Sequence, residues 1–365
     1  MRKPLPYWTW IALAVTGLLA ISFFTLREPR YGGKYLTAWV DHLVADRYDN
    51  IVNANPEAMD AIRHIGSDAV PYLLKWIEWD RPLQSKLPSG RLGRLLAKIA
   101  PRYFAKDRTK YPRGYCAAAA FAAIGAARAP GAIEKLNFIL NQTAWDESNS
   151  NAATALGFLA PESLPTLMAN LTNQNPRVKS FAACGFCSVG TNGRLALPLL
   201  LKCLDDPNKR FVGYVAYALG QMHSEPNVVV PALMLCLEQR NRDVRIQAMR
   251  ALREFGRDGR PALTNLLAVL EDRDKDLVFY AVSALGKIQL EADLVVPALA
   301  RCLRDRNGFV RKAAAISLGK FGQEARLPLV LTNLLTTLDD FDEDVATAAT
   351  NALRQIDPQH LGRAQ

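Results

Sequence analysis

The chain of 365 residues is long enough for two ordinary domains or for one extended repeat array. Half of its residues are hydrophobic but only 8% are aromatic, which favours helices packed through small residues and argues against a β-sandwich. The net charge of +10 is concentrated, because residues 80–115 carry ten basic against two acidic residues and residues 116–365 carry 27 against 25. The basic balance therefore comes from one segment and excludes a strongly basic surface along the rest of the chain.

The first element is an apolar segment near the N-terminus. The run from Trp8 to Leu26 contains no charged residue and follows Arg2 and Lys3. A helix of this length spans about 28 Å, at about 1.5 Å per residue, which is close to the hydrocarbon thickness of a bilayer. We predict a single transmembrane anchor within residues 1–30, and membrane contact through residues 8–26.

The anchor is predicted to be retained, although a cleaved and exported form is the alternative. Residues 20–22, Ala-Ile-Ser, offer the small residues that a signal peptidase needs, but the apolar run continues past them. Basic residues flank both ends of the segment, so they do not decide its orientation. A short N-terminal tail that stays in the cytoplasm would place the rest of the chain outside the inner membrane.

A basic insertion at residues 80–115 interrupts the helical repeat that we predict over residues 54–357. Its central stretch alternates basic and apolar residues at helical spacing, and the basic ones are Arg91, Arg94, Lys98 and Arg102. Three interpretations stay open. The apolar side of this stretch caps the repeat array, or the helix rests on anionic lipid near the anchor, or the segment binds an acidic protein or nucleic acid.

A constant period runs through the C-terminal half of the chain. The apolar residues that open each period are equally spaced in the sequence, at Val178, Phe211, Val244, Leu277 and Val310, and Val345 follows at a slightly longer interval. A large apolar residue stands eight positions after each opening residue, at Phe186, Leu219, Leu252, Leu285, Leu318 and Leu353. Apolar residues at offsets 0, 4, 7, 8 and 11 cover one face of a helix, so each period contains one amphipathic helix.

A second helix is predicted in each period, with a proline in its first turn, where the missing N–H is not needed. These prolines are Pro165, Pro198, Pro231, Pro261, Pro297 and Pro328. Each period is therefore a helical hairpin, and hairpins must stack into a solenoid to bury their apolar faces. Two columns of mostly small residues allow close stacking: Ala182, Val215, Ala248, Ala281, Ala314 and Ala349 in one, and Gly185, Ala218, Ala251, Ala284, Ser317 and Ala352 in the other.

This pattern resembles the short HEAT repeats of bacterial proteins, the type named from phycobilisome lyases. It reads Val-Pro-Ala-Leu, a polar turn, Val-Arg, Ala and Ala-Leu-Gly. The resemblance covers residues 54–357 apart from the insertion and implies an all-α solenoid of about eight helical hairpins, preceded by the transmembrane helix and followed by a tail at 358–365. Residues 31–53, which begin with Tyr-Gly-Gly, resemble the junction of membrane-anchored bacterial HEAT proteins.

The cysteines and histidines do not form a recognisable catalytic or metal site. Cys184 and Cys187 form a CxxC pair without a second pair or a nearby histidine. Cys203, Cys236 and Cys302 each follow a proline by five positions, so we interpret them as buried packing residues, with a metal or disulfide site as the alternative. No phosphate-binding loop or nucleophile elbow occurs, and we predict no catalytic residue, cofactor or metal, hence no enzyme.

A candidate binding surface lies three positions after each opening residue, at Phe181, Tyr214, Gln247 and Tyr280. Tyr217 and Arg250 share a column three positions further on. Aligned aromatic and arginine side chains suit a solenoid face that binds a partner, so Tyr214, Tyr217, Arg250 and Tyr280 are the candidate partner-binding residues. The alternative is that these rings fill space against neighbouring helices.

The expected function is that of a membrane-tethered HEAT-repeat scaffold or adaptor that binds a protein or peptide on its solenoid surface. A lyase- or chaperone-like accessory factor for a cofactor-bearing protein is the alternative. Nucleic-acid binding is disfavoured, because residues 116–365 are nearly neutral and a membrane anchor fits that role poorly.

Overall fold

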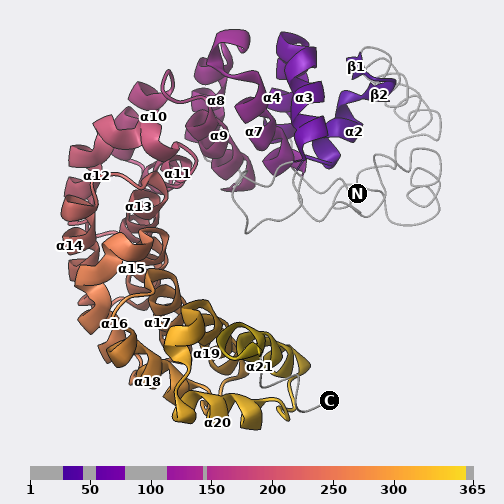
Figure 1. The fold of residues 1–365 in the computed structure, drawn as a ribbon. Helices are drawn as coiled ribbons and strands as arrows, with labels where there is room; N and C mark the ends of the chain where they lie inside the picture. The colour runs from indigo at the N-terminus through magenta and orange to yellow at the C-terminus, as the bar shows by residue number, and fades with distance from the viewer. Residues whose placement is uncertain (1–27, 44–54, 79–112, 143–145, 359–365) are drawn as a thin grey trace, which may run out of the picture. The chain divides into compact units, whose positions relative to one another are not determined.

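The computed structural model describes residues 28–43, 55–78, 113–142 and 146–358 (Figure 1). They fall into two compact units, which meet in sequence between Ser163 and Leu164. The predicted anchor and the basic residues Arg91, Arg94, Lys98 and Arg102 lie outside the described residues. Within the described ranges, no helix has both the length and the apolar character that a bilayer span requires.

The first unit begins with two short antiparallel strands and continues with helices. Its elements are β1 (Arg30–Tyr31), β2 (Lys34–Tyr35), α2 (Leu36–Asp41), α3 (Pro56–Ile65), η2 (Gly66–Ala69), α4 (Val70–Glu78), α7 (Arg113–Ile124), η4 (Ala126–Arg128), α8 (Ala132–Asn141) and α9 (Asp146–Phe158). Helix α2 packs on α3, α4 on α7, and α8 on α9, so this unit consists of helix pairs.

The strand pair and α2 are part of the packed first unit, within the stretch that the sequence marks as a junction. The indole Nε1 of Trp39 donates a hydrogen bond to the carbonyl oxygen of Tyr31 at 3.1 Å. Leu36, Trp39 and Val40 are buried, and α2 contacts both α3 and α7. The spacing of these residues gives α2 the apolar stripe that a packed helix needs.

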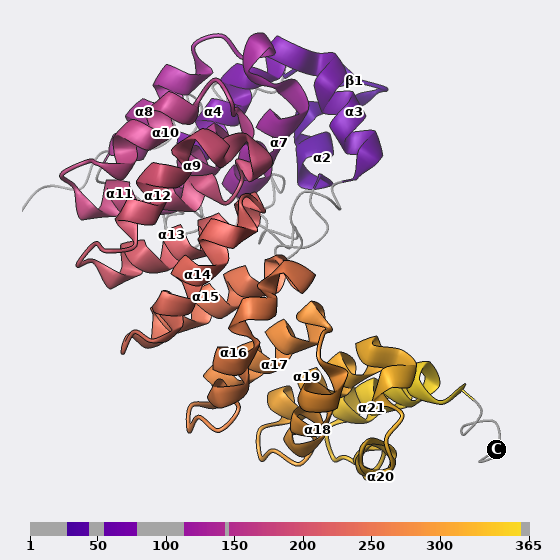
Figure 2. The same cartoon turned by 60° about the vertical axis from the view of Figure 1, so that its left-hand side comes forward.

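The second unit consists of helices in two rows. Its helices are α10 (Leu164–Leu171), α11 (Pro176–Phe186), α12 (Leu197–Cys203), α13 (Lys209–Met222), α14 (Pro226–Leu237), α15 (Arg242–Glu254), α16 (Leu263–Val269), α17 (Lys275–Ile288), α18 (Ala292–Cys302), α19 (Gly308–Phe321), α20 (Pro328–Thr337) and α21 (Glu343–Ile356). The odd-numbered helices pack on one another in series, and the even-numbered helices follow along their other side (Figures 1 and 2). The predicted all-α helical repeat is confirmed.

Each odd-numbered helix begins at a polar cap. The capping residues are Asn175, Asn208, Asn241, Asp274, Asn307 and Asp342, and each side chain accepts a hydrogen bond from a backbone N–H of the first turn. Such a cap satisfies a donor that has no partner inside the helix, so the helix start is fixed at the same place in every repeat. The apolar residue that opens each period stands three positions after its cap, and all six are buried.

Glycines of the Ala-Leu-Gly pattern let neighbouring odd-numbered helices approach closely. A Cβ added at Gly220 would lie 2.4 Å from the Cα of Ala251 in the next helix of the row. Gly286, in the same position of a later repeat, meets Ser317 in the same way, whereas a Cβ at Gly319 would lie 3.2 Å from the Cα of Ala352 and would also meet the side chain of Gln355. Gly220 and Gly286 therefore require glycine because a backbone or a short side chain occupies the space.

Two kinds of connection alternate between the hairpins. One begins with a glycine at positive φ, at Gly190, Gly256 and Gly322, and continues as a 3₁₀ segment: η5 (Gly190–Ala196), η6 (Gly256–Ala262) and η7 (Gly322–Ala325). The other uses non-glycine residues at positive φ, at His223, Glu225, Gln289 and Glu291, and leads directly into α14 and α18. Each kind recurs in every second hairpin, so the structural unit is a pair of hairpins.

This alternation corrects the predicted position of two prolines. Pro231 and Pro297 lie inside α14 and α18, whereas Pro165, Pro198 and Pro328 stand in the first turn as predicted. The reason is that the direct connection starts the helix earlier in the repeat than the 3₁₀ connection does. Pro198, Pro231 and Pro297 stand at the same distance from their opening residues, while the helix start moves. Pro261 also differs from the prediction, because it lies in η6, before α16 (Leu263–Val269) begins.

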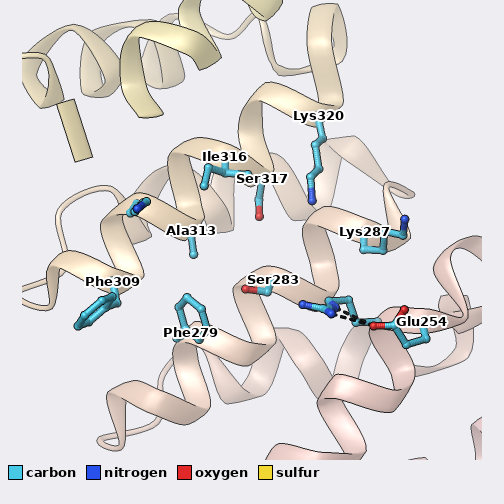
Figure 3. Close-up of a pocket in the computed structure, with 11 residues that line it drawn as sticks. Glu254, Phe279, Ser283, Lys287, Phe309, Ala313, Ile316, Ser317 and Lys320 are labelled. Atoms are coloured by element: carbon cyan, nitrogen blue, oxygen red, sulfur yellow. Dashed lines mark hydrogen bonds and ion pairs between the residues drawn. The ribbon is translucent and has the colours of Figure 1, made fainter. Parts of the chain in front are cut away.

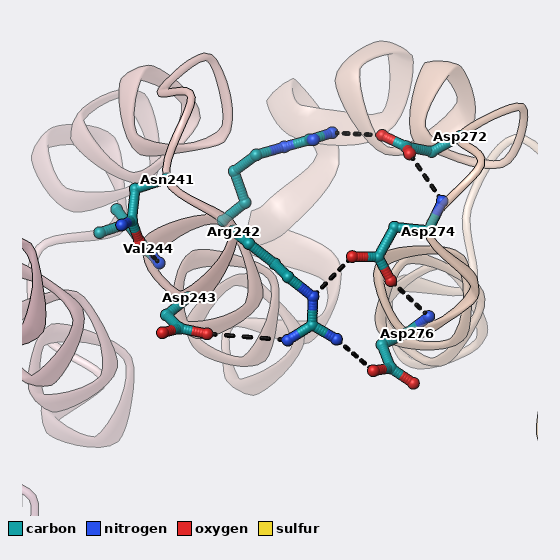
Figure 4. Close-up of polar contacts among 8 residues, drawn as sticks. Asn241, Arg242, Asp243, Val244, Asp272, Asp274 and Asp276 are labelled. Carbon is teal, nitrogen blue, oxygen red and sulfur yellow. Dashed lines mark hydrogen bonds and ion pairs between the residues drawn. The ribbon is translucent and has the colours of Figure 1, made fainter.

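In every second hairpin, the residue that follows the opening residue is a lysine or arginine that forms an ion pair with the next repeat. Lys179 pairs with Asp206, Arg245 with Asp272 at 3.0 Å, and Arg311 with Asp340 at 2.7 Å. Each aspartate also accepts the backbone N–H of the capping residue two positions later. Figure 4 shows this arrangement for Asp272, beside Arg242, which pairs with Asp243, Asp274 and Asp276. The pairs therefore join one repeat to the cap of the next.

Candidate functional site

A groove runs over the exposed face of three odd-numbered helices in the second unit. It has a volume of about 460 Å³, and its lining residues are Arg253, Glu254, Phe279, Ser283, Lys287, Phe309, Lys312, Ala313, Ile316, Ser317 and Lys320, from α15, α17 and α19 (Figure 3). A hollow of about 300 Å³ adjoins it and is lined by Arg242, Ile246, Asp276, Phe279, Tyr280 and Phe309. Phe279 and Phe309 line both, so the two form one continuous surface.

One end of the groove is apolar and open to solvent. Phe309 is 73% exposed and Ile316 is 44% exposed, both on α19. Phe279 on α17 is half-buried and packs edge-to-face on Tyr280, with ring centroids 5.1 Å apart. Large apolar side chains that gather at one exposed place mark a surface that binds another molecule.

The other end of the groove is basic. Arg253 at this end pairs with Glu254 at 2.8 Å, whereas Lys312, three positions after Phe309 at the apolar end, pairs with Asp344 at 2.7 Å. Lys287 and Lys320 form no ion pair with any residue that the structure describes, and Figure 3 shows Lys320 extending from α19 toward α17. Burial, followed by the positive charges of Lys287 and Arg253, lowers the pKa of Lys320. An anionic group placed here would relieve that repulsion.

The groove opens where the glycine pattern breaks. In α13, α17 and α19 the residue nine positions after the opening residue is Gly220, Gly286 or Gly319, whereas in α15 it is Arg253. A long side chain at this position excludes the close helix approach that glycine permits. The side chain of Arg253 therefore lines the groove at a place where α13, α17 and α19 have a glycine.

The sequence-predicted residues Tyr214, Tyr217, Arg250 and Tyr280 lie on the same row of helices. All four are half-buried. The guanidinium of Arg250 lies 4.3 Å from the ring centroid of Tyr217, so these two residues stabilise each other. Tyr280 lines the hollow beside Phe279. Phe181, in the column of Tyr214 and Tyr280, is buried and fills space between helices.

Sequence reasoning missed Phe309, Ile316, Lys287 and Lys320. A signal was present for Phe309, which stands one position before the opening Val310. The same position holds an arginine or aspartate in the other five repeats: Arg177, Arg210, Asp243, Asp276 and Asp344. A phenylalanine where every other repeat has a charge is unusual for a solvent-facing position.

Four of the cysteines, Cys187, Cys203, Cys236 and Cys302, have surroundings that raise the pKa of the thiol. Cys236 and Cys302 are buried, and burial raises the pKa of each thiol to about 11. The hydrogen bond with Cys184, together with burial, raises the pKa of Cys187 well above its ordinary value. Thiols with raised pKa values are poor nucleophiles and poor metal ligands. In the described ranges, no cluster of three His, Cys, Asp or Glu residues is placed to hold a metal ion.

Comparison with known proteins identifies the repeat. Residues 164–253 and 263–354 match the family of HEAT repeats. Kap121p bound to Pho4p has a similar structure, with a TM-score of 0.55 and 14% identity over 84% of this chain and 38% of that chain. An engineered protein is less similar in structure, with a TM-score of 0.44 and 20% identity over 89% of this chain and 88% of that chain. The CpcE–CpcF complex of phycocyanin lyase from Nostoc sp. has a TM-score of 0.40 and 19% identity over 60% of this chain and 93% of that chain. No curated protein matches the sequence.

Proposed function

Because this chain carries HEAT repeats over residues 164–253 and 263–354, we propose that it is a scaffold that binds a protein or peptide partner in the groove across α15, α17 and α19. The exposure of Phe309 and Ile316 beside a basic end carries the proposal. Contact of these apolar side chains with water is unfavourable, and a bound partner would bury them. Kap121p, which shares the helical-repeat fold, was solved with Pho4p bound.

The lining of the groove suits the binding of a partner better than it suits catalysis. Its lining consists mainly of aromatic, aliphatic and cationic side chains; its one carboxylate, Glu254, pairs with Arg253, and the hydroxyl of Ser317 donates a hydrogen bond to the carbonyl oxygen of Val282 at 3.1 Å. Such a surface provides apolar contact and charge attraction to a partner. The proposal is therefore a non-catalytic adaptor.

We expect the double substitution Phe309→Ser with Ile316→Ser to reduce partner capture at least tenfold, because both side chains would be buried by the partner. The measurement is quantitative affinity purification of the full-length protein from its native cells. Stability should change by less than about 0.5 kcal/mol, since both side chains are exposed.

Leu294→Ser is the matched control for this experiment. Leu294 lies on α18 in the other row of helices and is 57% exposed. The control should retain the same co-purifying proteins as the unmodified protein. Equal recovery of those proteins by the control and by the double variant would remove the groove from the proposal.

The scaffold is proposed to be held at a membrane by residues 8–26, with the repeats on the extracytoplasmic side of a bacterial inner membrane. The uncharged run from Trp8 to Leu26 supports this part. Full-length protein should stay in the membrane fraction after alkaline carbonate washing, and a chain that lacks residues 1–30 should be released. Release of both forms alike would disprove the anchor and leave the binding groove unaffected.

A further inference from the structure

The two ends of the groove lie at a defined separation along α17. Phe279 stands at the apolar end and Lys287 at the basic end, eight positions later in the same helix. At about 1.5 Å per residue, this places their Cα atoms about 12 Å apart. An extended peptide covers that distance in about four residues, at about 3.3 Å each.

Uncompensated positive charge is confined to one end of this surface. At the apolar end, Arg242 is held by Asp274 at 2.6 Å and by Asp276. At the basic end, Glu254 is engaged by Arg253, which leaves Lys287 and Lys320 as the cations without an ion-pair partner among the described residues. Charge complementarity therefore selects an anionic group at the Lys287 and Lys320 end.

We infer that the groove binds an extended peptide segment of a partner protein in which a carboxylate lies about four residues from a large apolar side chain. The apolar side chain packs among Phe279, Phe309 and Ile316, and the carboxylate pairs with Lys287 and Lys320. This inference rests on the proposed function and adds the chemistry by which the partner is recognised.

Carboxylates fit this surface better than a nucleic-acid backbone does. A single strand needs a basic track that follows several successive phosphates. Here Asp276, Glu254 and Asp344 interrupt the row of basic residues along the groove and its rim. Two adjacent lysines match one or two carboxylates, and the exposed phenylalanine accounts for the other half of the recognition.

The test measures fluorescence anisotropy of short labelled peptides with the full-length protein in mild detergent. The first probe carries one Phe followed four positions later by Glu-Glu in a Gly/Ser background. In the second probe Lys-Lys replaces Glu-Glu, and in the third Ser replaces Phe. A fluorescent oligothymidylate serves as the nucleic-acid probe.

The first probe should bind saturably, and each of the other three probes at least tenfold more weakly. Lys287→Glu with Lys320→Glu should weaken the first probe at least tenfold and strengthen the Lys-Lys probe. Lys202→Glu with Arg304→Glu makes the same change of charge on exposed residues outside the groove, so it should leave both affinities unchanged. The reversed preference cannot come from misfolding, because a misfolded protein would lose both probes.

Three results would overturn the inference: no binding of the first probe, equal binding of the Lys-Lys probe, or binding of oligothymidylate alone. Partner capture in cells separates this failure from that of the proposed function. Capture that depends on Phe309 and Ile316 but not on the two lysines leaves the scaffold proposal standing without the carboxylate. Capture that depends neither on Phe309 and Ile316 nor on the two lysines contradicts both the proposed function and this inference.

Discussion

Arg311→Ala is expected to lower the free energy of unfolding by about 3–5 kcal/mol, the largest effect of any single substitution considered for this protein. The side chains of Arg311 and Asp340 are 8% and 9% exposed. Arg311 donates to both carboxylate oxygens, at 2.7 and 2.8 Å, and to the carbonyl oxygen of Asp305 at 2.9 Å. Removing the guanidinium would leave a buried carboxylate without its counter-charge and would release the junction of α19 with α21.

Lys312→Ala is the matched control on the same helix. Lys312 also pairs with an aspartate of the next repeat, Asp344, but those side chains are 37% and 73% exposed. An exposed pair contributes at most about 1 kcal/mol, so the control should unfold close to the unmodified protein. Urea unfolding followed by far-ultraviolet circular dichroism measures both variants. Equal losses in the two would show that burial of the pair does not matter.

Acidification gives an independent check on the Arg311 result. The hydrogen bonds from Arg311 lower the pKa of Asp340 below its ordinary value. A carboxyl whose pKa is lower in the folded state stabilises the fold above its unfolded pKa of about 4, and this contribution is lost as the pH falls through the folded pKa. The stability difference between the unmodified protein and Arg311→Ala should therefore shrink below about pH 4.

Gly220→Ala is expected to destabilise the protein by about 1–3 kcal/mol. The new methyl group would lie 2.4 Å from the Cα and 2.6 Å from the Cβ of Ala251. Because a backbone atom cannot rotate away, α13 and α15 would have to separate. The alanine would otherwise favour the helix by up to about 1 kcal/mol, so a net loss measures the helix contact directly.

Gly213→Ala on the same helix is the control. A Cβ at Gly213 would meet only the Cγ of Gln247, at 3.4 Å, which is close to an ordinary contact with a flexible side chain. This variant should be as stable as the unmodified protein or slightly more stable. Thermal unfolding of both variants decides the matter, and a loss of stability in Gly213→Ala equal to that in Gly220→Ala would contradict the close-approach explanation.

The helical repeat was predictable because its signals lie inside single helices. The opening residues from Val178 to Val345 are all buried, and each helix of their row begins two positions earlier, behind an Asn or Asp cap. The alternation between two kinds of hairpin was not predicted, because the opening residues are alike in all repeats. The difference lies in the connections, where Gly190 and Gly256 alternate with His223 and Gln289.

The groove was only partly predictable. The column that contains Tyr280 identified the correct row of helices, and Tyr280 lines the hollow beside the groove. Helical spacing shows which residues share a face, but how far that face is open depends on the distance between helices. Here Arg253 stands where α13, α17 and α19 have a glycine, and its side chain lines the groove, which the column of opening residues does not show.

The alternating connections restrict how the length of this protein can change. Excision of residues 206–238, a single period, would bring Gln239 to the place of Asp206 and leave the ammonium group of Lys179 facing an amide. Excision of residues 206–271, two periods, would bring Asp272 there and restore the charge partner. Shortened or lengthened versions are therefore best made from cassettes of two hairpins, and copy number in such an array changes most safely by an even count.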